Sequence, residues 1–345
     1  MQWFTKDNLS NPLVIMFVVY YMEYVRSILV SNHSRQKIER STIINLACLF
    51  LFGLLASLVR HNNLYVVVIS IAFLVFLRQA AAKRILIIIS AAACFAGVSV
   101  ISGALISTLD ATPRGIRDTL SIPLQQTARF VRDHPELVTQ EDIIAIDPVL
   151  RVDALARRYN PGLSDPVKGM FRYDDRSLLP DYFKAWYRMG LRKPGTYIAA
   201  TTANSYSYYA PVKSSPDNRG YAGIHHSAYL LERPRPPSEA FDFSDSRERP
   251  QRDGIIRLFE AFRRLPVINL FYQLAHYTWF LALLVLILLR KGKKQAIVAF
   301  MPAFLILLTC IASPVNGEVR YFLPIITATP LYSLWFLSSA YLHNP

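Results

Sequence analysis

The sequence predicts an all-α polytopic membrane protein with about seven transmembrane helices and one mainly helical insert between the fourth and the fifth. Of its 345 residues, 52% are hydrophobic, and many of these form long apolar runs. Such runs predict membrane spans, because about 20 helical residues cross a hydrocarbon core of roughly 30 Å. One long polar run separates a four-span region, residues 1–108, from a three-span region, residues 267–345. We therefore expect a soluble insert over residues 109–266.

The apolar runs place the spans in order along the chain. A short polar stretch precedes the first run, and polar turns or short basic loops separate the others. The third run is short and is expected to borrow residues from the loop that follows it. The predicted spans are residues 12–30, 42–59, 64–77, 85–106, 267–289, 296–312 and 321–341.

The charges are divided unevenly between the insert and the rest of the chain. The insert holds 24 of the 38 Lys and Arg residues and 20 of the 24 Asp and Glu residues, so the basic excess lies mainly outside it. Three short loops, residues 32–41, 78–84 and 290–294, carry most of that excess, which is the pattern of cytoplasmic loops. A nucleic-acid-binding protein would instead collect basic residues on one soluble face. We therefore expect a lipid bilayer and no nucleic acid as partner.

Placing the basic loops in the cytoplasm orients the whole chain in the cell membrane. The insert becomes extracytoplasmic, and the polar turns at residues 60–63 and 313–320 fall on the same outer face. The C-terminus is then cytoplasmic and the N-terminus outside, with no cleavable signal pattern before the first span. Seven spans with this orientation can insert unaided, but we expect that the natural product begins upstream, with an odd number of further spans.

The insert is predicted to be mainly helical, because no alternation in it is long enough for a sheet. Thr139 followed by Asp142 resembles an N-terminal helix cap, and Gly190 is expected to end the last of these helices. The predicted helices cover residues 125–133, 139–146, 152–159 and 180–189.

The end of the insert has a different composition. Residues 232–253 are rich in Pro, Ser and charge, which predicts a mobile loop. Residues 255–262 then show an apolar stripe at helical spacing. This stripe predicts an amphipathic helix that either lies on the membrane before the fifth span or packs within the insert.

The turn before the last span holds the strongest candidate binding residues, Glu318, Arg320 and Tyr321. They fall where a lipid head group would lie, and an Arg can bind two phosphate oxygens at once. The alternative is an ordinary Pro/Gly turn in which Glu318 pairs with Arg320. Arg60 and His61 are expected on the same face, where His61 is either a general acid or base or a solvated loop residue.

Two other groups of polar residues are weaker candidates. In the fifth span, Asn269, Gln273 and His276 are spaced so as to share one helical face, where they either join helices by hydrogen bonds or line a substrate path. The tyrosines of residues 197–209 either stack on sugar rings or form part of a core. The insert motifs add Gln125, Gln126, Arg129, Asp165 and Lys168.

Within the second of those motifs the sequence leaves two interpretations open. Asp165 either pairs with Lys168 across a turn or caps a short helix. The three cysteines all fall in apolar segments, and no HExxH, phosphate-binding loop or GxSxG pattern is present. These patterns indicate no metal site and leave the catalytic residues unknown.

Four motifs together resemble an uncharacterised family of bacterial polytopic membrane proteins. They are RHNNLY at residues 60–65, IPLQQTAR at 122–129, SDPVK at 164–168 and SPVNGEVRYFLP at 313–324. That family is similar in architecture to GT-C glycosyltransferases, which use polyprenyl-phosphate-linked sugars. GT-C enzymes carry a catalytic acidic residue in the first outer loop, and no residue of this chain matches that motif. The resemblance thus also implies that the natural chain is longer at its N-terminus.

The resemblance implies a GT-C-like glycosyltransferase, or a remnant of one, that acts at the outer face of the cell membrane on a lipid-linked sugar donor. Arg320 and Arg60 would hold the donor phosphate, and the insert would shape the acceptor site. Transfer would need an acidic residue to hold a divalent metal or to take a proton. The alternative is a non-catalytic cell-envelope scaffold or carrier component whose insert binds a protein partner. A transporter is a third hypothesis, although no inverted repeat is visible.

Overall fold

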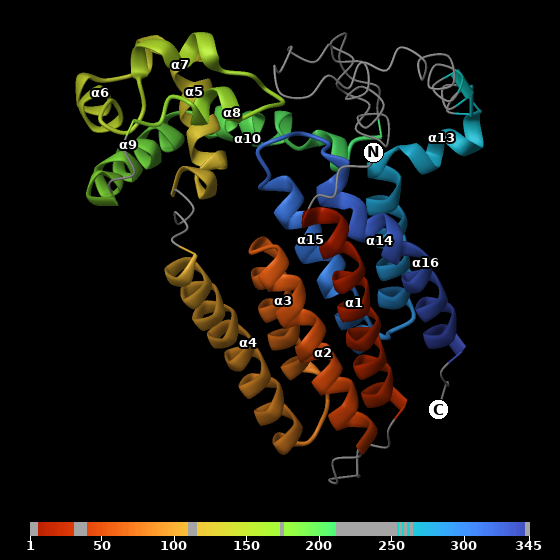
Figure 1. Cartoon of the computed structure of the whole chain (residues 1–345). Coiled ribbons are helices and arrows are strands. Elements are labelled where there is room, and N and C mark those ends of the chain that lie inside the picture. Colours follow the sequence, from red (N-terminus) through yellow and green to blue (C-terminus); the bar gives the residue numbers. More distant parts are fainter. Residues whose placement is uncertain are drawn as a thin grey trace.

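A computed structural model gives the fold of most of the chain. Two regions follow from it: a bundle of long apolar helices, and a cap of shorter helices at one end of that bundle (Figure 1). The predicted mobile loop at residues 232–253, and half of the residues of the predicted amphipathic stripe at 255–262, lie outside the described residues. Those described are residues 6–30, 40–109, 116–172, 176–211 and 265–341, with a few positions between 254 and 262.

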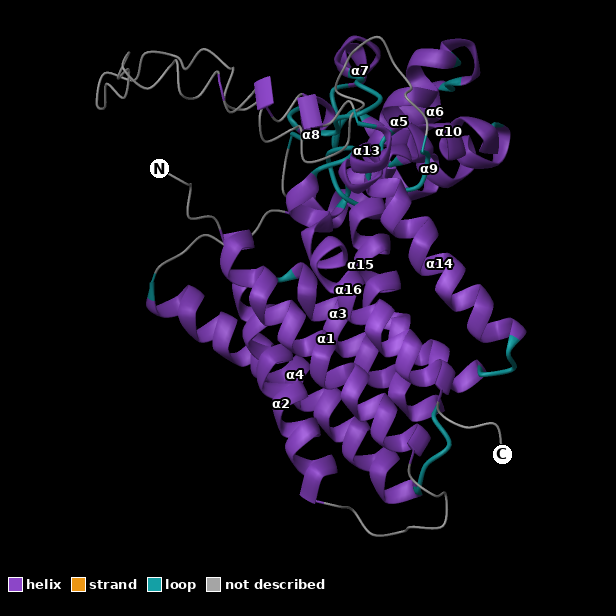
Figure 2. Cartoon of the chain, turned by 90° about the vertical axis from the view of Figure 1, so that its right-hand side faces the viewer, coloured by secondary structure: helices purple, strands orange, loops and turns teal. Residues whose placement is uncertain are grey.

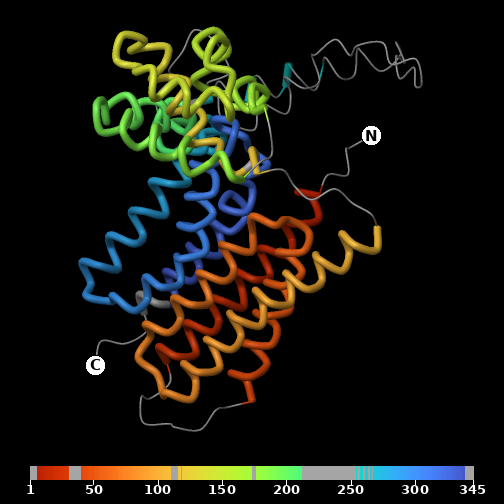
Figure 3. Tube along the Cα trace, turned by 90° about the vertical axis from the view of Figure 1, so that its left-hand side faces the viewer, coloured from red at the N-terminus to blue at the C-terminus, as the bar shows by residue number. Residues whose placement is uncertain are grey.

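The bundle is built from apolar helices that run back and forth between its two ends (Figures 1 and 2). Within each half of the bundle, on either side of the cap, helices that follow one another in the chain pack together. Figure 3 shows the helix Ala81–Thr108, labelled α4, leaning outward along one side of the bundle. The bundle helices are α1 (Lys6–Val30), α2 (Arg40–Val59), α3 (Asn62–Phe73), η1 (Leu74–Phe76), α4 (Ala81–Thr108), α14 (Leu274–Arg290), η6 (Lys294–Phe300), α15 (Met301–Ile311) and α16 (Val319–Tyr341).

Five helical segments are long and apolar enough to cross a membrane: α1, α2, α4, η6 with α15, and α16. Two further apolar helices, Asn62–Phe76 and Leu274–Arg290, are shorter than that criterion requires. Many large apolar side chains on the outside of the bundle are exposed, as expected for a surface that lipid covers. The described helices are therefore those of a multi-pass membrane protein, whereas a total of seven spans stays a prediction.

The fifth predicted span is not one continuous helix. Helix α13 (Pro266–Tyr272) ends before Gln273, whose backbone is extended (φ −99°, ψ 119°), and α14 starts at Leu274. Figure 1 shows α13 at an angle to α14 near the cap end of the bundle. The expected span over residues 267–289 is therefore wrong at its start, because the extended backbone at Gln273 redirects the chain.

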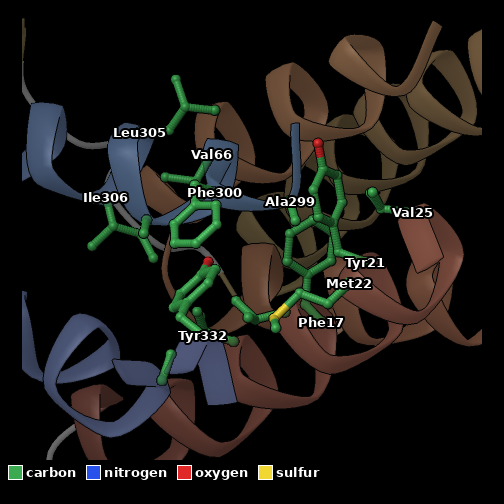
Figure 4. Close-up of a cluster of buried hydrophobic side chains, with 14 of the residues drawn as sticks. Phe17, Tyr21, Met22, Val25, Val66, Ala299, Phe300, Leu305, Ile306 and Tyr332 are labelled. Atoms are coloured by element: carbon green, nitrogen blue, oxygen red, sulfur yellow. The ribbon is translucent and has the colours of Figure 1, made fainter. Parts of the chain in front are cut away.

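Aromatic side chains from distant parts of the sequence fill the centre of the bundle (Figure 4). Phe300 stacks on Tyr332 with ring centroids 5.0 Å apart, and Phe17 packs against Tyr21 at 5.9 Å. All four rings are buried. Aromatic pairs in such arrangements stabilise a core beyond their area of contact, so α1 and α16, at opposite ends of the chain, form one core.

The cap has its own buried apolar cluster, separate from that of the bundle. We use the name cap for residues 116–211; those that the structure describes, 116–172 and 176–211, are helical apart from turns, loops and isolated bridges. Its elements are η2 (Ile116–Thr119), α5 (Ser121–Asp133), η3 (Pro135–Leu137), α6 (Gln140–Ile146), α7 (Val152–Arg158), α8 (Asp165–Lys168), η4 (Arg176–Leu178), α9 (Leu179–Arg192), α10 (Pro194–Ala203) and η5 (Tyr206–Tyr208).

The cap confirms the predicted N-terminus of α6 and corrects the end of α9. Thr139 and Asp142 form a reciprocal capping box. Gly190 does not end its helix, because α9 continues to Arg192. A Cβ at Gly190 would lie 2.9 Å from the ring of Tyr197, so this glycine allows close packing of α10 on α9 instead of ending the helix.

Candidate functional site

Charged residues from three separate parts of the chain meet at the cap end of the bundle. Arg60 lies in the turn between α2 and α3, while Glu318 and Arg320 lie at the start of α16. The fourth member is Asp7, in the first turn of α1. We call these four residues, with Tyr321, the charged cluster.

Asp7 is the buried centre of the charged cluster. Its side chain is only 5% exposed, and its Oδ1 lies 3.2 Å from Nη1 of Arg60. Its Oδ2 lies 3.9 Å from Nε of Arg320, which is itself 3.4 Å from Oε1 of Glu318. Two carboxylates and two guanidinium groups thus balance one another. Such compensation is required of charges withdrawn from water, because an unpaired buried charge is costly.

Both arginines also contact the ring of Tyr321. The guanidinium carbon of Arg60 lies 4.5 Å from the ring centroid and that of Arg320 lies 5.0 Å from it. In addition, Nη2 of Arg320 donates to the Tyr321 hydroxyl at 3.3 Å. Cation–π contacts hold a guanidinium without using its N–H groups. One ring therefore brings two cations together and leaves N–H donors that can bind an anion.

Local bonds fix the elements that carry these side chains. The amide of Asn63 donates to Ser10 Oγ at 2.8 Å and to the Ala56 carbonyl at 3.0 Å, which ties α1 to the α2–α3 turn. Before α16, Gly317 adopts a left-handed conformation (φ +69°), which glycine adopts without strain. The chain can thus turn sharply and begin α16 with Arg320 beside Asp7.

The exposure of the two arginines differs. The Arg60 side chain is 15% exposed, whereas that of Arg320 is 50% exposed. Arg320 is thus the residue that a ligand from outside can reach, with Arg60 behind it. Guanidinium groups bind phosphate and carboxylate through paired N–H bonds, so the cluster can bind an oxyanion that takes over part of the role of Asp7.

The structure brings four of the five predicted outer-face residues together. Glu318 pairs with Arg320, which the alternative of an ordinary Pro/Gly turn also predicted. Arg60 lies over the ring of Tyr321, beside them. His61 is not part of the charged cluster. It is exposed, and its ring packs edge-on against Tyr65 at 6.0 Å.

Sequence reasoning missed Asp7. One signal for it was present, because a chain with its N-terminus outside places Asp7 at the same end as the Arg60 and Glu318 turns. The stretch before the first predicted span carries no motif and gave no reason to select it. Only the packing of α1 against α2 and α16 brings its carboxylate to Arg60.

The insert motif residues hold the cap together and lie outside the charged cluster. Gln125 donates to the Asn160 carbonyl at 2.8 Å, and Gln126 donates to Thr201 Oγ1 at 3.0 Å. Arg129 donates to the Ala199 carbonyl at 2.8 Å. These bonds join α5 to α10 and to the segment that follows α7.

Of the two interpretations of Asp165, the ion pair is the one observed. Asp165 Oδ1 lies 3.7 Å from Nζ of Lys168, and the residue at the N-cap of α8 is Ser164. The tyrosine run is at least partly core, because Tyr197 and Tyr208 are both buried.

The polar residues of the fifth predicted span do not share one helix. Asn269 lies on α13, Gln273 lies at the break, and His276 lies on α14. The expectation of a single polar face is therefore wrong, because that face assumed a continuous helix. Asn269 Oδ1 and His276 Nδ1 are both buried without a hydrogen-bond partner.

No group of three or more His, Cys, Asp or Glu residues that could hold a metal ion occurs within the described part of the chain.

The chain was compared with protein families, curated proteins and solved structures. A family of unknown function, DUF6020, matches residues 2–344. No curated protein and no solved structure matches the chain. Since the match covers nearly its whole length, this chain belongs to the DUF6020 family.

Proposed function

We propose that the charged cluster binds the phosphate of a membrane lipid at the outer face of the cell membrane. The observation that carries this proposal is the pair of guanidinium groups on one ring, Arg60 and Arg320 on Tyr321, with a carboxylate already beside them. A carboxylate and a phosphate present similar oxygens to a guanidinium. The cluster lies at the ends of apolar helices, where lipid phosphates lie.

The function that this site supports best is sugar transfer from a polyprenyl-phosphate-linked donor, in the manner of GT-C glycosyltransferases. An acceptor hydroxyl oxygen would bond to the anomeric carbon of the sugar while the bond from that carbon to the donor phosphate breaks. The lipid phosphate would leave with the electron pair, and Arg60 and Arg320 would stabilise its charge. Asp7 would take the acceptor proton, which supplies the acidic residue that no motif of the chain contains.

A second candidate function rests on the charge balance of the cluster. Two acids compensate two bases. In this second function, the charged cluster binds no ligand and joins α1, the α2–α3 turn and α16. The cap also exposes Ile144, Leu191 and Ile198, each at least 65% exposed. These residues favour a non-catalytic scaffold or carrier component whose cap binds a protein.

The first experiment compares lipid binding by the purified protein and its Arg320→Ala variant. We expect Arg320→Ala to weaken binding of a polyprenyl phosphate by about tenfold or more, because a charge-assisted hydrogen bond contributes about 1.5–3 kcal/mol. Native mass spectrometry in detergent measures the bound fraction. Arg151→Ala is the matched control, since Arg151 is an exposed cap arginine that pairs with Asp153. Equal binding by wild type and Arg320→Ala would exclude the phosphate role and favour the scaffold.

A further inference from the structure

The turn that presents Glu318 and Arg320 is held by the cap as well as by the bundle. Ser164 N donates to the Pro314 carbonyl at 2.8 Å, and Asn316 N donates to the Gly162 carbonyl at 3.0 Å. Between these bonds, Leu163 and Val315 form an antiparallel bridge. Two segments about 150 residues apart in sequence thus pair through their backbones.

A second cap segment, which precedes and includes η5, binds the same turn. Asn204 Nδ2 donates to the Ser313 carbonyl at 2.8 Å, and Ser207 N donates to Asn316 Oδ1 at 3.1 Å. Both asparagines, Asn204 and Asn316, are buried. Asn316 therefore bonds one cap segment through its backbone and the other through its side chain.

Tyr208 connects this junction to α16 and α14. Its hydroxyl accepts the N–H of Glu318 at 2.9 Å, and its ring stacks on Phe322 with centroids 5.6 Å apart. Its backbone carbonyl accepts the hydroxyl of Thr278 at 2.6 Å. Because Tyr208 is fully buried, these contacts leave it little freedom to move independently of α16.

The hydroxyl of Tyr208 is suited to remain a fixed partner of the turn. Burial raises its pKa well above the usual value, so the hydroxyl keeps its proton. That proton can be donated to the carbonyl of Val315 or of Glu318, each 3.4 Å away. One cap side chain thus both accepts from and donates to the turn, two residues before Arg320.

We propose that Tyr208 and Asn316 are positioning residues through which the cap sets the place of Arg320 and Tyr321, and hence the affinity of the charged cluster for a phosphate. This inference rests on the proposed function. Neither residue belongs to the charged cluster. Coupling between two sites is reciprocal, so a phosphate bound at the cluster stabilises the junction between the turn and the cap.

The test compares Tyr208→Phe with Tyr182→Phe. Both remove one hydroxyl from a fully buried tyrosine of the cap, but the Tyr182 hydroxyl bonds Thr127, inside the cap and away from the turn, at 3.0 Å. With a polyprenyl phosphate as probe, we expect Tyr208→Phe to weaken binding by about three- to tenfold, the range of one or two hydrogen bonds. Tyr182→Phe should bind as the wild type does.

Hydrogen exchange distinguishes a positioning role from a merely structural one, because only a positioning role makes amide exchange in the cap depend on the bound phosphate. In the wild type, the polyprenyl phosphate should slow amide exchange at residues 204–208, which lie outside the cluster, and this protection should shrink in Tyr208→Phe. If Tyr208→Phe fails to fold, Asn316→Ala takes its place and is expected to weaken binding in the same way.

The outcomes separate this inference from the proposed function. Loss of binding in Arg320→Ala with wild-type binding in both Tyr208→Phe and Asn316→Ala would overturn the positioning role alone. A wild-type protein that binds no polyprenyl phosphate and shows no protection would overturn both. Equal weakening by Tyr182→Phe and Tyr208→Phe would show general loosening of the cap and also contradict the inference.

Discussion

At the scale of single residues, a change at Asp7 distinguishes a charged cluster that binds phosphate from one that only joins helices. Its carboxylate lies beside Arg60 and within 3.9 Å of Arg320 while being almost fully buried. A phosphate at the same guanidinium groups must approach this negative charge. The two anions therefore compete for the arginines. Removal of the Asp7 charge should then change the affinity for the phosphate in a direction that can be measured.

We expect Asp7→Asn to raise the affinity for a polyprenyl phosphate about threefold or more and to abolish any sugar transfer. Removal of one negative charge close to the bound anion is worth on the order of 1 kcal/mol, while an amide cannot take the acceptor proton. Binding by native mass spectrometry and transfer of a radiolabelled sugar measure the two effects. Glu23→Gln is the control, since Glu23 pairs with Arg26 on an exposed part of α1. Weaker binding in Asp7→Asn would mean instead that Asp7 orders Arg60.

At the scale of secondary-structure elements, buried charge joins α6 to α9 within the cap. Asp142 has no exposed side-chain surface, completes the capping box of α6, and bonds Arg188 and Arg192 of α9. Burial by itself would raise the pKa of Asp142, but the hydrogen bonds from Arg192 and Thr139 outweigh it and lower the pKa. The charged form is thus the one that stabilises the fold.

A carboxylate with a lowered pKa stabilises the cap above its unfolded pKa, about 3.9 for Asp, and loses that contribution as pH falls through the folded value. We expect Asp142→Asn to destabilise the cap at pH 7 by about 1.5–3 kcal/mol, because an uncharged amide loses the charge-assisted hydrogen bonds with Arg188 and Arg192. Hydrogen exchange across residues 140–146 and 179–192 measures the effect. Asp153→Asn, on the exposed side of α7, should change nothing. A loss at pH 7 no larger than that of Asp153→Asn would contradict this role.

At the scale of the whole molecule, the structure divides polar and basic features between two ends. The cap, the Arg60 turn and the Glu318 turn share one end of the bundle (Figure 1), because each helix reverses the direction of the one before it. Arg78 and Lys291 lie in loops at the other end, where Arg290 is the last residue of α14. This division agrees with the arrangement that the basic loops predicted, and the side of the membrane on which each end lies stays a prediction.

Cysteine labelling tests that orientation. In a background with Cys48, Cys94 and Cys310 replaced by Ala, we expect Asp153→Cys to react with a membrane-impermeant maleimide in intact cells. Lys291→Cys should react only after permeabilisation, because the basic loops face the cytoplasm. Both positions are exposed. The reverse pattern would place the cap in the cytoplasm and exclude an outer-face donor site.

The sequence by itself determined the helical class, the approximate bounds of most helices and the grouping of turns by end. These properties depend on local hydropathy, on capping residues such as Thr139 and on charge counts, all of which are short-range patterns. The sequence also selected Arg60, Arg320 and Tyr321, because they stand at the ends of apolar runs on the face opposite the basic loops.

Only the tertiary structure decided which charges meet and how the cap is attached. Asp7 reaches Arg60 through the packing of α1, and Tyr208 reaches Glu318 through contacts between segments 110 residues apart. The break at Gln273 was equally invisible, since the apolar pattern continues across it. Long-range contacts and backbone direction depend on how helices pack in three dimensions, and no local pattern in the chain encodes them.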